Sequence, residues 1–275
     1  MADMKLAVIL PAAGFSGRYL QQGGLRSKLD EDLGGKPLLQ RTIETFTKFE
    51  DDAVTIAAII VAGPHADDAF AEFKQRHSDR LGLLGATIVR GGVTHRWETV
   101  AAALAHLPQD CTHIAVHDAA RPCMSHELLA RVVRASQHHP AVIPAVPASD
   151  TVKRAYDTGE VMGGTDPLAA ILGESAGAKQ PLRAVKETLD RSNLVLVQTP
   201  QVFRADVLRR AYATLDGETS QPTDDASLVE SLGERVIVVD GDPRNIKVTI
   251  PADLVLARAI MGYKEPEGRA AHKKF

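Results

Sequence analysis

Short apolar runs alternate with longer amphipathic segments along the first half of the chain. The run Lys5–Leu10 is continuous and ends at a proline, which is typical of a buried parallel strand. The segment Pro37–Phe49 instead has apolar residues at helical spacing, and its proline suits the first turn of a helix. The same two patterns predict strands at 54–62, 86–89, 112–116 and 141–146, and helices at 64–76, 94–107 and 125–137.

This regular alternation predicts an α/β fold with a mostly parallel, twisted sheet flanked by helices. It resumes towards the C-terminus, with strands at 194–197 and 235–239 and helices at 205–215, 224–232 and 251–261. Sheets of this kind bind ligands at the carboxyl ends of their strands. We therefore expect the polar loops after Leu10, Val89 and Val116 to form the functional site.

The alternation is interrupted from about residue 149 to residue 192, where glycines are frequent and no period holds. We interpret this stretch as a protruding β-arm, with an irregular and flexible middle at 163–180. The prediction is one domain over residues 1–262 that includes the arm, followed by a charged flexible tail at 263–275.

Composition narrows the functional classes. The chain has 275 residues, 44% hydrophobic and 24% charged, with a formal net charge of −3. This supports a substantial core and gives no sign of nucleic-acid or membrane binding. Two cysteines fit a reducing compartment, and the apolar run near the N-terminus is too short for a membrane span or a signal peptide. We expect a cytoplasmic protein.

Small residues and two cations follow the first strand. The sequence Pro11-Ala-Ala-Gly-Phe-Ser-Gly-Arg18 lets backbone N–H groups approach an anion closely. Arg18 and Lys28 can then neutralise charge on a transferring phosphoryl group. The loop matches neither the dinucleotide fingerprint G-x-G-x-x-G nor the P-loop pattern. From spacing alone, a plain glycine-rich turn with surface cations is an equally good explanation.

A second polar loop, His117-Asp-Ala-Ala-Arg-Pro122, comes directly after another strand. A carboxylate such as that of Asp118 suits a Mg²⁺ that also touches phosphate oxygens. Arg121 can form a two-pronged contact with a substrate phosphate. The competing interpretation is an ion pair between Asp118 and Arg121 that only stabilises the loop.

Two further loops are weaker signals on their own. The pair Gly91-Gly92 precedes a predicted helix and can pack against a nucleobase, although a plain turn is the simpler explanation. Asn245 and Lys247 can point towards a site one strand away from the first loop, although an edge turn with an exposed lysine also explains them.

Together and in this order, the motifs resemble the 2-C-methyl-D-erythritol 4-phosphate cytidylyltransferase family of the non-mevalonate isoprenoid pathway. The resemblance spans residues 5–262, and its other motifs are Asp150–Lys153, Asp190-Arg191, Thr199–Phe203 and Thr223–Ala226. It implies a Rossmann-like nucleotidyltransferase domain and a homodimer joined through the arm at about 149–192. It also implies in-line transfer of CMP from CTP to methylerythritol phosphate, with Mg²⁺ as cofactor and pyrophosphate as product.

The resemblance also implies roles for individual residues. Arg18, Lys28 and Lys247 would be catalytic, and Asp118 would hold the metal. The nucleotide would be bound by Ala12, Ala13, Gly14, Gly91, Gly92, Arg96, Thr99 and Asp118. The acceptor phosphate would be surrounded, partly from the partner subunit, by Arg121, Thr151, Arg191, Thr199 and Lys247.

This chain departs from the family pattern at several points. Ser27 precedes Lys28 where the family has proline, the loop from Arg18 to Lys28 is longer, and the arm at 156–190 is extended. These differences leave two alternatives open. One is a cytidylyltransferase for another polyol phosphate such as ribitol 5-phosphate, and the other is a non-catalytic nucleotide-binding relative. A nicotinamide-dependent oxidoreductase is disfavoured because its fingerprint is missing.

Overall fold

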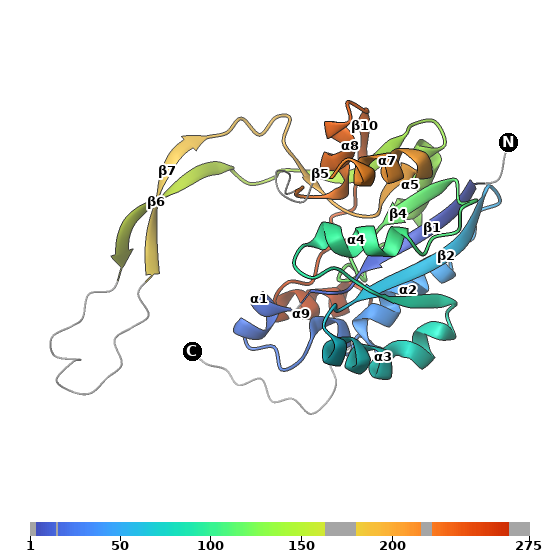
Figure 1. The fold of residues 1–275 in the computed structure, drawn as a ribbon. Helices are drawn as coiled ribbons and strands as arrows, with labels where there is room; N and C mark the ends of the chain where they lie inside the picture. The colour runs from blue at the N-terminus through green and yellow to red at the C-terminus, as the bar shows by residue number, and fades with distance from the viewer. Residues whose placement is uncertain (1–3, 15, 163–179, 216–221, 264–275) are drawn as a thin grey trace. The chain divides into compact units, whose positions relative to one another are not determined.

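The chain divides into two units by its internal contacts (Figure 1). We call Met1–Ala145 with Val197–Phe275 the body, and Val146–Leu196 the arm. The computed structural model describes residues 4–14, 16–162, 180–215 and 222–263.

The body is built on a mostly parallel sheet with strand order β10-β5-β9-β4-β1-β2-β3. β1 (Met4–Pro11) pairs in parallel with β2 (Val54–Gly63) on one side and β4 (His113–Val116) on the other. The other strands in this order are β3 (Ala86–Arg90), β5 (Ala141–Pro147), β9 (Gln201–Arg204) and β10 (Val236–Asp240). The predicted α/β class is confirmed, with β9 as an antiparallel member between β4 and β5.

β1 shows why this sheet is covered on both faces. Leu6, Val8 and Leu10 belong to one hydrophobic cluster, whereas Ala7 and Ile9 point the other way into a second cluster. The first cluster includes side chains from α2 (Leu38–Thr47), α3 (Asp67–Gly82), α5 (His126–Ser136) and α9 (Pro251–Ile260). The second includes side chains from α4 (Arg96–Leu104), α7 (Ala205–Ala213) and α8 (Asp225–Ser231). Each large side chain buried in these layers contributes about 1.5–3 kcal/mol.

Some short elements and boundaries differ from the predictions. The loop between Arg18 and Lys28 contains the short helix α1 (Gly17–Gln21) and leads into the single-turn 3-10 helix η1 (Lys28–Asp30). Both are too short to show a hydrophobic period. Helix α4 begins after residue 95 rather than at 94, because Glu98 accepts hydrogen bonds from two backbone amides before it. Helix α3 continues beyond residue 76 because its apolar period extends to a buried Leu81.

The described part of the arm contains an antiparallel pair, β6 (Lys153–Met162) and β7 (Gln180–Thr188). β8 (Val195–Val197) lies at the boundary with the body. Large apolar side chains on the pair are more than half exposed: Tyr156, Val161, Met162 and Val185. The segment 163–179, which the sequence predicts to be flexible, lies outside the described residues, as does the predicted tail from residue 264.

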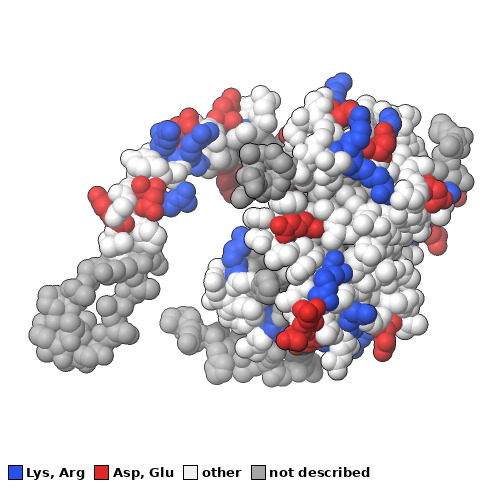
Figure 2. Space-filling model, viewed as in Figure 1, with Lys and Arg blue, Asp and Glu red and all other residues white. Residues whose placement is uncertain are grey.

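The surface of the described residues carries both signs of charge. On the face shown in Figure 2, Lys and Arg side chains are interspersed with Asp and Glu side chains. Within the described ranges, every helix is either too short or too polar to cross a lipid bilayer.

Candidate active site

A cleft of about 240 Å³ opens in the body where β1, β3 and β4 end. The loops that follow these strands are far apart in the sequence, but they lie around one space because parallel strands end at the same edge of a sheet. The predicted site residues that line the cleft are Ala12, Ala13, Gly14, Lys28, Gly92, Arg96, Thr99, Asp118 and Lys247.

The loop after β1 leaves open space beside its backbone. The Ala12 amide donates to the carbonyl of Ala62 at 2.8 Å, which ties the start of the loop to β2. A Cβ built on Gly14 would meet no atom within 4 Å. Ser16 then turns the chain into α1 with a left-handed φ of 52°. The loop can therefore admit a ligand close to its main chain.

The glycine pair is required by the packing of its own loop. A Cβ on Gly91 would lie 2.5 Å from the carbonyl oxygen of Gly63, and one on Gly92 would lie 2.1 Å from Cβ of Glu98. The Gly92 amide donates to the Thr99 hydroxyl at 3.2 Å. Thr99 therefore fixes the loop against the first turn of α4, which accounts for a threonine at this position without any contact to ligand.

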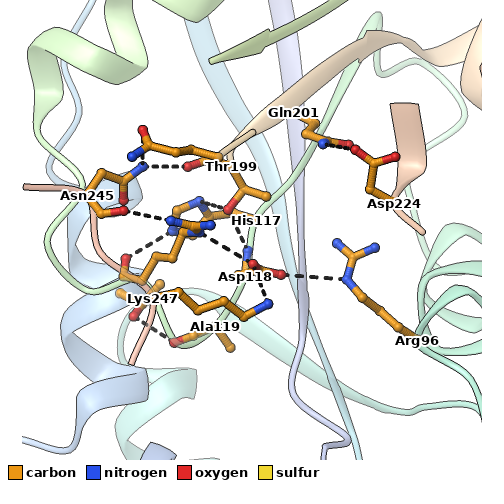
Figure 3. A network of polar contacts seen from close by, with 12 residues as sticks. Arg96, His117, Asp118, Ala119, Thr199, Gln201, Asp224, Asn245 and Lys247 are labelled. Carbon is orange, nitrogen blue, oxygen red and sulfur yellow. Dashed lines mark hydrogen bonds and ion pairs between the residues drawn. The ribbon is translucent and has the colours of Figure 1, made fainter. Parts of the chain in front are cut away.

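Asp118 is the centre of the charged groups in the cleft (Figure 3). Lys247 Nζ lies 2.9 Å from its Oδ2, Arg121 Nε lies 3.4 Å from Oδ2, and Arg96 Nε lies 3.6 Å from Oδ1. Burial alone would raise the pKa of Asp118, but Lys247 and Arg96 outweigh it and hold the pKa far below its usual range. The carboxylate is therefore ionised at neutral pH. The predicted loop ion pair with Arg121 exists, as one of three contacts.

Lys28 brings a further cation to the cleft. Within the described ranges, no carboxylate lies within ion-pair distance of its ammonium group, whereas Lys247 is paired. Burial lowers the pKa of Lys28, and the neighbouring charges of Lys247 and Arg18 lower it further. Arg18 itself is an exposed residue of α1. The cleft thus holds more positive than negative charge.

Ser27, the residue before Lys28, has a backbone φ like that of a proline. Ser27 has a φ of −54°, which is within the range of proline. Its hydroxyl also accepts from the Leu29 amide at 3.4 Å, and the Lys28 amide donates to the Ser16 hydroxyl at 3.3 Å. Serine at this position therefore has a φ that proline could also adopt, and it adds local hydrogen bonds.

Arg96 links two carboxylates that come from different parts of the chain. Besides Asp118, its guanidinium contacts Oδ2 of Asp225 at 2.8 Å, and the Tyr212 hydroxyl donates to Oδ1 of Asp225 at 2.6 Å. Burial alone would lower the pKa of Arg96, but the two carboxylates raise it. The guanidinium is therefore permanently charged and held in place, with Asp225 only 1% exposed beneath it.

His117 fixes the backbone around Asp118. Its Nε2 lies 3.1 Å from the carbonyl oxygen of Arg121, which only accepts, so Nε2 carries the proton. Nδ1 then accepts from the Thr199 hydroxyl at 3.1 Å, and that hydroxyl accepts from the Asp118 amide at 3.0 Å. Burial lowers the pKa of His117 to about 4, so this neutral ring is a structural support at physiological pH.

Hydrogen bonds to Asn245 fix the segment that carries Lys247. Arg121 Nη1 donates to the backbone carbonyl of Asn245 at 2.7 Å, and Asn245 Nδ2 donates to the backbone carbonyl of Thr199 at 2.8 Å. Figure 3 shows Asn245 beside Thr199 in this network. Arg121 and Thr199, predicted to contact the acceptor phosphate, thus already have protein partners around Asp118.

The structure does not bring every predicted residue to the cleft. Gly91 supports the loop without lining the cleft, and the lining also does not include Arg18, Arg121 and Thr199. Thr151 and Arg191 belong to the arm, where the Arg191 guanidinium donates to the backbone carbonyl of Ser149. Their part in acceptor binding stays a prediction.

The roles of Asp225 and Tyr212 were missed at the level of sequence. The signal available was the motif Thr223–Ala226, which contains Asp225 but says nothing of a partner. The hydrogen bond from Arg96 to Asp225 spans 129 positions in the chain, so only the folded structure reveals it.

The chain is similar in sequence and in structure to known proteins. Residues 6–172 and 173–263 match the model of the family described as 2-C-methyl-D-erythritol 4-phosphate cytidylyltransferase. A relative of that name from Rhodococcus jostii is 38% identical over 264 residues, covering 95% of this chain and 98% of the relative. Another from Frankia casuarinae is 37% identical over 268 residues, covering 97% and 85%. The crystal structure of the protein of that name from Thermus thermophilus has a TM-score of 0.65 at 30% identity, covering 94% and 98%.

Proposed function

This chain belongs to the 2-C-methyl-D-erythritol 4-phosphate cytidylyltransferase family, and on that basis we propose that its cleft transfers CMP from CTP to 2-C-methyl-D-erythritol 4-phosphate. The observation that carries the proposal is the charge of the cleft. Lys28 lacks a carboxylate partner within the described ranges, while Asp118 is already matched by cations. Such a cleft favours binding of a polyanion. It stabilises most strongly a leaving group on which negative charge develops during the reaction.

The chemistry asks for alignment and charge neutralisation rather than for a strong base. The acceptor phosphate is an anion at neutral pH, and one of its oxygens forms a bond to the α-phosphorus of CTP. The bond from that phosphorus to the bridging oxygen breaks, and its electron pair leaves with pyrophosphate. We assign to Lys28 and Arg18 the neutralisation of the leaving group, and to Lys247 the neutralisation of the phosphoryl group being transferred.

We further propose that Asp118 holds Mg²⁺ together with phosphate oxygens of CTP. Within the described ranges, no three His, Cys, Asp or Glu side chains are grouped as a metal cage. A single carboxylate still fits Mg²⁺, which commonly takes one or two carboxylates and completes its shell with phosphates and water. The low pKa of Asp118 keeps an oxygen ligand charged at neutral pH. When bound, the ion would neutralise phosphate charge.

The acceptor end of the site and the homodimer are also proposals. We infer that two chains associate through their arms and that Thr151 and Arg191 reach the acceptor phosphate. The exposed apolar side chains on β6 and β7 support this, because such side chains are usually covered in an assembly. Sedimentation of the whole protein should give the mass of a dimer, and a monomer at micromolar concentration would contradict the inference.

The alternatives have less support. The relatives are named for methylerythritol phosphate rather than for ribitol 5-phosphate, and the cleft retains the cations that a non-catalytic relative would not need. A cytoplasmic location remains a prediction from composition.

Release of pyrophosphate from CTP, measured with methylerythritol phosphate and with ribitol 5-phosphate in parallel, tests the proposal. Methylerythritol phosphate should give the higher kcat/KM. Lys28→Ala should lower kcat about 10²–10³-fold, as loss of one preorganised donor does, while the protein stays folded. The matched control is Lys74→Ala, because Lys74 is an exposed lysine on α3. Turnover by Lys28→Ala close to wild type would contradict the assignment.

A further inference from the structure

The turn that carries Lys28 is tied to helix α3 by its own last residue. Lys28 and Asp30 belong to the same 3-10 turn, η1, and Lys28 lines the cleft. The carboxylate of Asp30 contacts α3 instead: Arg76 Nη1 lies 2.5 Å from Oδ2, and His77 Nε2 lies 2.8 Å from Oδ1. One short turn therefore connects the cleft to a helix on the sheet.

The contact between Asp30 and His77 is largely buried. The side chain of His77 is 3% exposed and that of Asp30 is 13% exposed. The His77 ring packs against Phe73 with 4.6 Å between ring centroids, and Phe73 belongs to the hydrophobic cluster that includes β1. The N–H of Nε2 does not point straight at the carboxylate oxygen, so the contact is short but bent.

The contacts of Asp30 with His77 and Arg76 favour its ionised form. Burial alone would raise the pKa of Asp30, but the close contact with His77 and the charge of Arg76 lower it. Breaking the contact would leave a largely buried carboxylate without its partners, which disfavours the present position of the turn.

The position of Lys28 needs such a support. The same neighbourhood contains Lys247 and Arg18, whose charges repel the Lys28 ammonium, and no carboxylate within the described ranges pairs with it. The hydrogen bonds inside the loop, at 3.3 Å to Ser16 and 3.4 Å to Ser27, are long and uncharged. The contacts of Asp30 are the charged link between this turn and α3.

We propose that Asp30, held by His77 and Arg76, is a positioning residue that keeps Lys28 at the triphosphate end of the cleft. The proposal rests on the proposed function, since it gives Lys28 a phosphate to meet. The proposal also gives a role to Arg76 and His77 of α3, a helix that has no other assigned part in the site. A misplacement of the ammonium by about 1 Å can cost on the order of 100-fold in rate.

The test separates this role from simple stabilisation by comparing affinity for CTP with affinity for CMP, which lacks the β- and γ-phosphates. Asp30→Ala and His77→Leu should weaken CTP binding about tenfold and lower kcat about 10–100-fold, while CMP affinity stays within about twofold. His77→Gln should recover most of the loss, because its amide can place a donor near the position of Nε2. Asp67→Asn is the matched control, since it removes an exposed ion pair with Arg90 from the same helix.

A double-mutant cycle completes the test. In a Lys28→Ala background, His77→Leu should weaken CTP binding no further, because the group being positioned is absent. An equal loss in both backgrounds, or a fall in CMP affinity matching that for CTP, would overturn the proposal. If Asp30→Ala does not fold, the His77→Leu and His77→Gln pair answers the same question. Absence of pyrophosphate release by the wild-type enzyme, with the affinity ratios still as expected, would instead count against the proposed function.

Discussion

The ion pair between Arg96 and Asp225 allows a specific prediction about the free energy of unfolding. Arg96 Nη1 lies 2.8 Å from Asp225 Oδ2, and the Asp225 side chain is 1% exposed. Arg96→Met removes the guanidinium but keeps an unbranched apolar stem. The Tyr212 hydroxyl would then be left as a hydrogen-bond donor to a buried charge. We expect a clear loss of folding stability.

The size of the loss follows from the geometry. At 2.8 Å and an effective dielectric constant near 20, the attraction is about 6 kcal/mol, and part of it offsets the cost of removing both charges from water. Removing one partner of a buried pair typically costs about 3–5 kcal/mol. The Arg96 side chain is 32% exposed, so water can partly replace it, and we expect the lower end, about 3 kcal/mol.

The assay is denaturant unfolding followed by circular dichroism at pH 7, for both single variants and the double variant. Arg96→Met should lower the free energy of unfolding by about 3 kcal/mol, which corresponds to a fall in Tm of roughly 6–12 °C for a chain of this size. Arg96→Met combined with Asp225→Asn should return to within about 1 kcal/mol of wild type, because no charge is stranded. A single-variant cost below about 1 kcal/mol, or a double variant that shows the sum of both single losses, would contradict this prediction.

Three further predictions concern pH, loop packing and the support of Asp118. Burial and neighbouring cations lower the pKa of Lys28, so its charge is lost at a lower pH than that of an ordinary lysine. The fall of kcat/KM on the alkaline side should therefore begin at a lower pH, and Lys28→Arg should move this fall to higher pH. Gly92→Ala would place a Cβ 2.1 Å from a side chain of α4 and should raise KM for CTP about tenfold by shifting the loop, whereas Gly82→Ala has free space and should behave as wild type in the same assay. Thr199→Val leaves the Asp118 amide without its acceptor and should cost about 1–3 kcal/mol in thermal unfolding, and Thr199→Ser should restore it.

The main strands and helices could be predicted from the chain because their patterns are local. Continuous burial of Leu6–Leu10 requires cover on both faces, and the helices that supply this cover show their own period. The strand Gln201–Arg204 was not predicted, because four residues following a proline carry no clear period. Its antiparallel place between β4 and β5 depends on partners that are distant in the sequence.

Part of the candidate site could likewise be predicted from the sequence, and part could not. Asp118 and the loop after β1 were predicted from their positions after apolar strands, and the structure places both at the cleft. What the loop spacing left undecided was whether Asp118 merely pairs with Arg121. The structure shows that Lys247 and Arg96 share the same carboxylate, which turns a local ion pair into the centre of a charged cleft.

The amino-acid sequence was sufficient to predict most strands and helices, the loops that line the cleft and, through its ordered motifs, the family. Those properties depend on neighbours within a few positions, or on residue identities that can be read along the chain. The folded structure was needed to show which cations contact Asp118, which carboxylate pairs with Arg96, and which helix contacts the turn of Lys28. Such contacts join segments that pack together through the shape and burial of the whole body, so no local pattern records them.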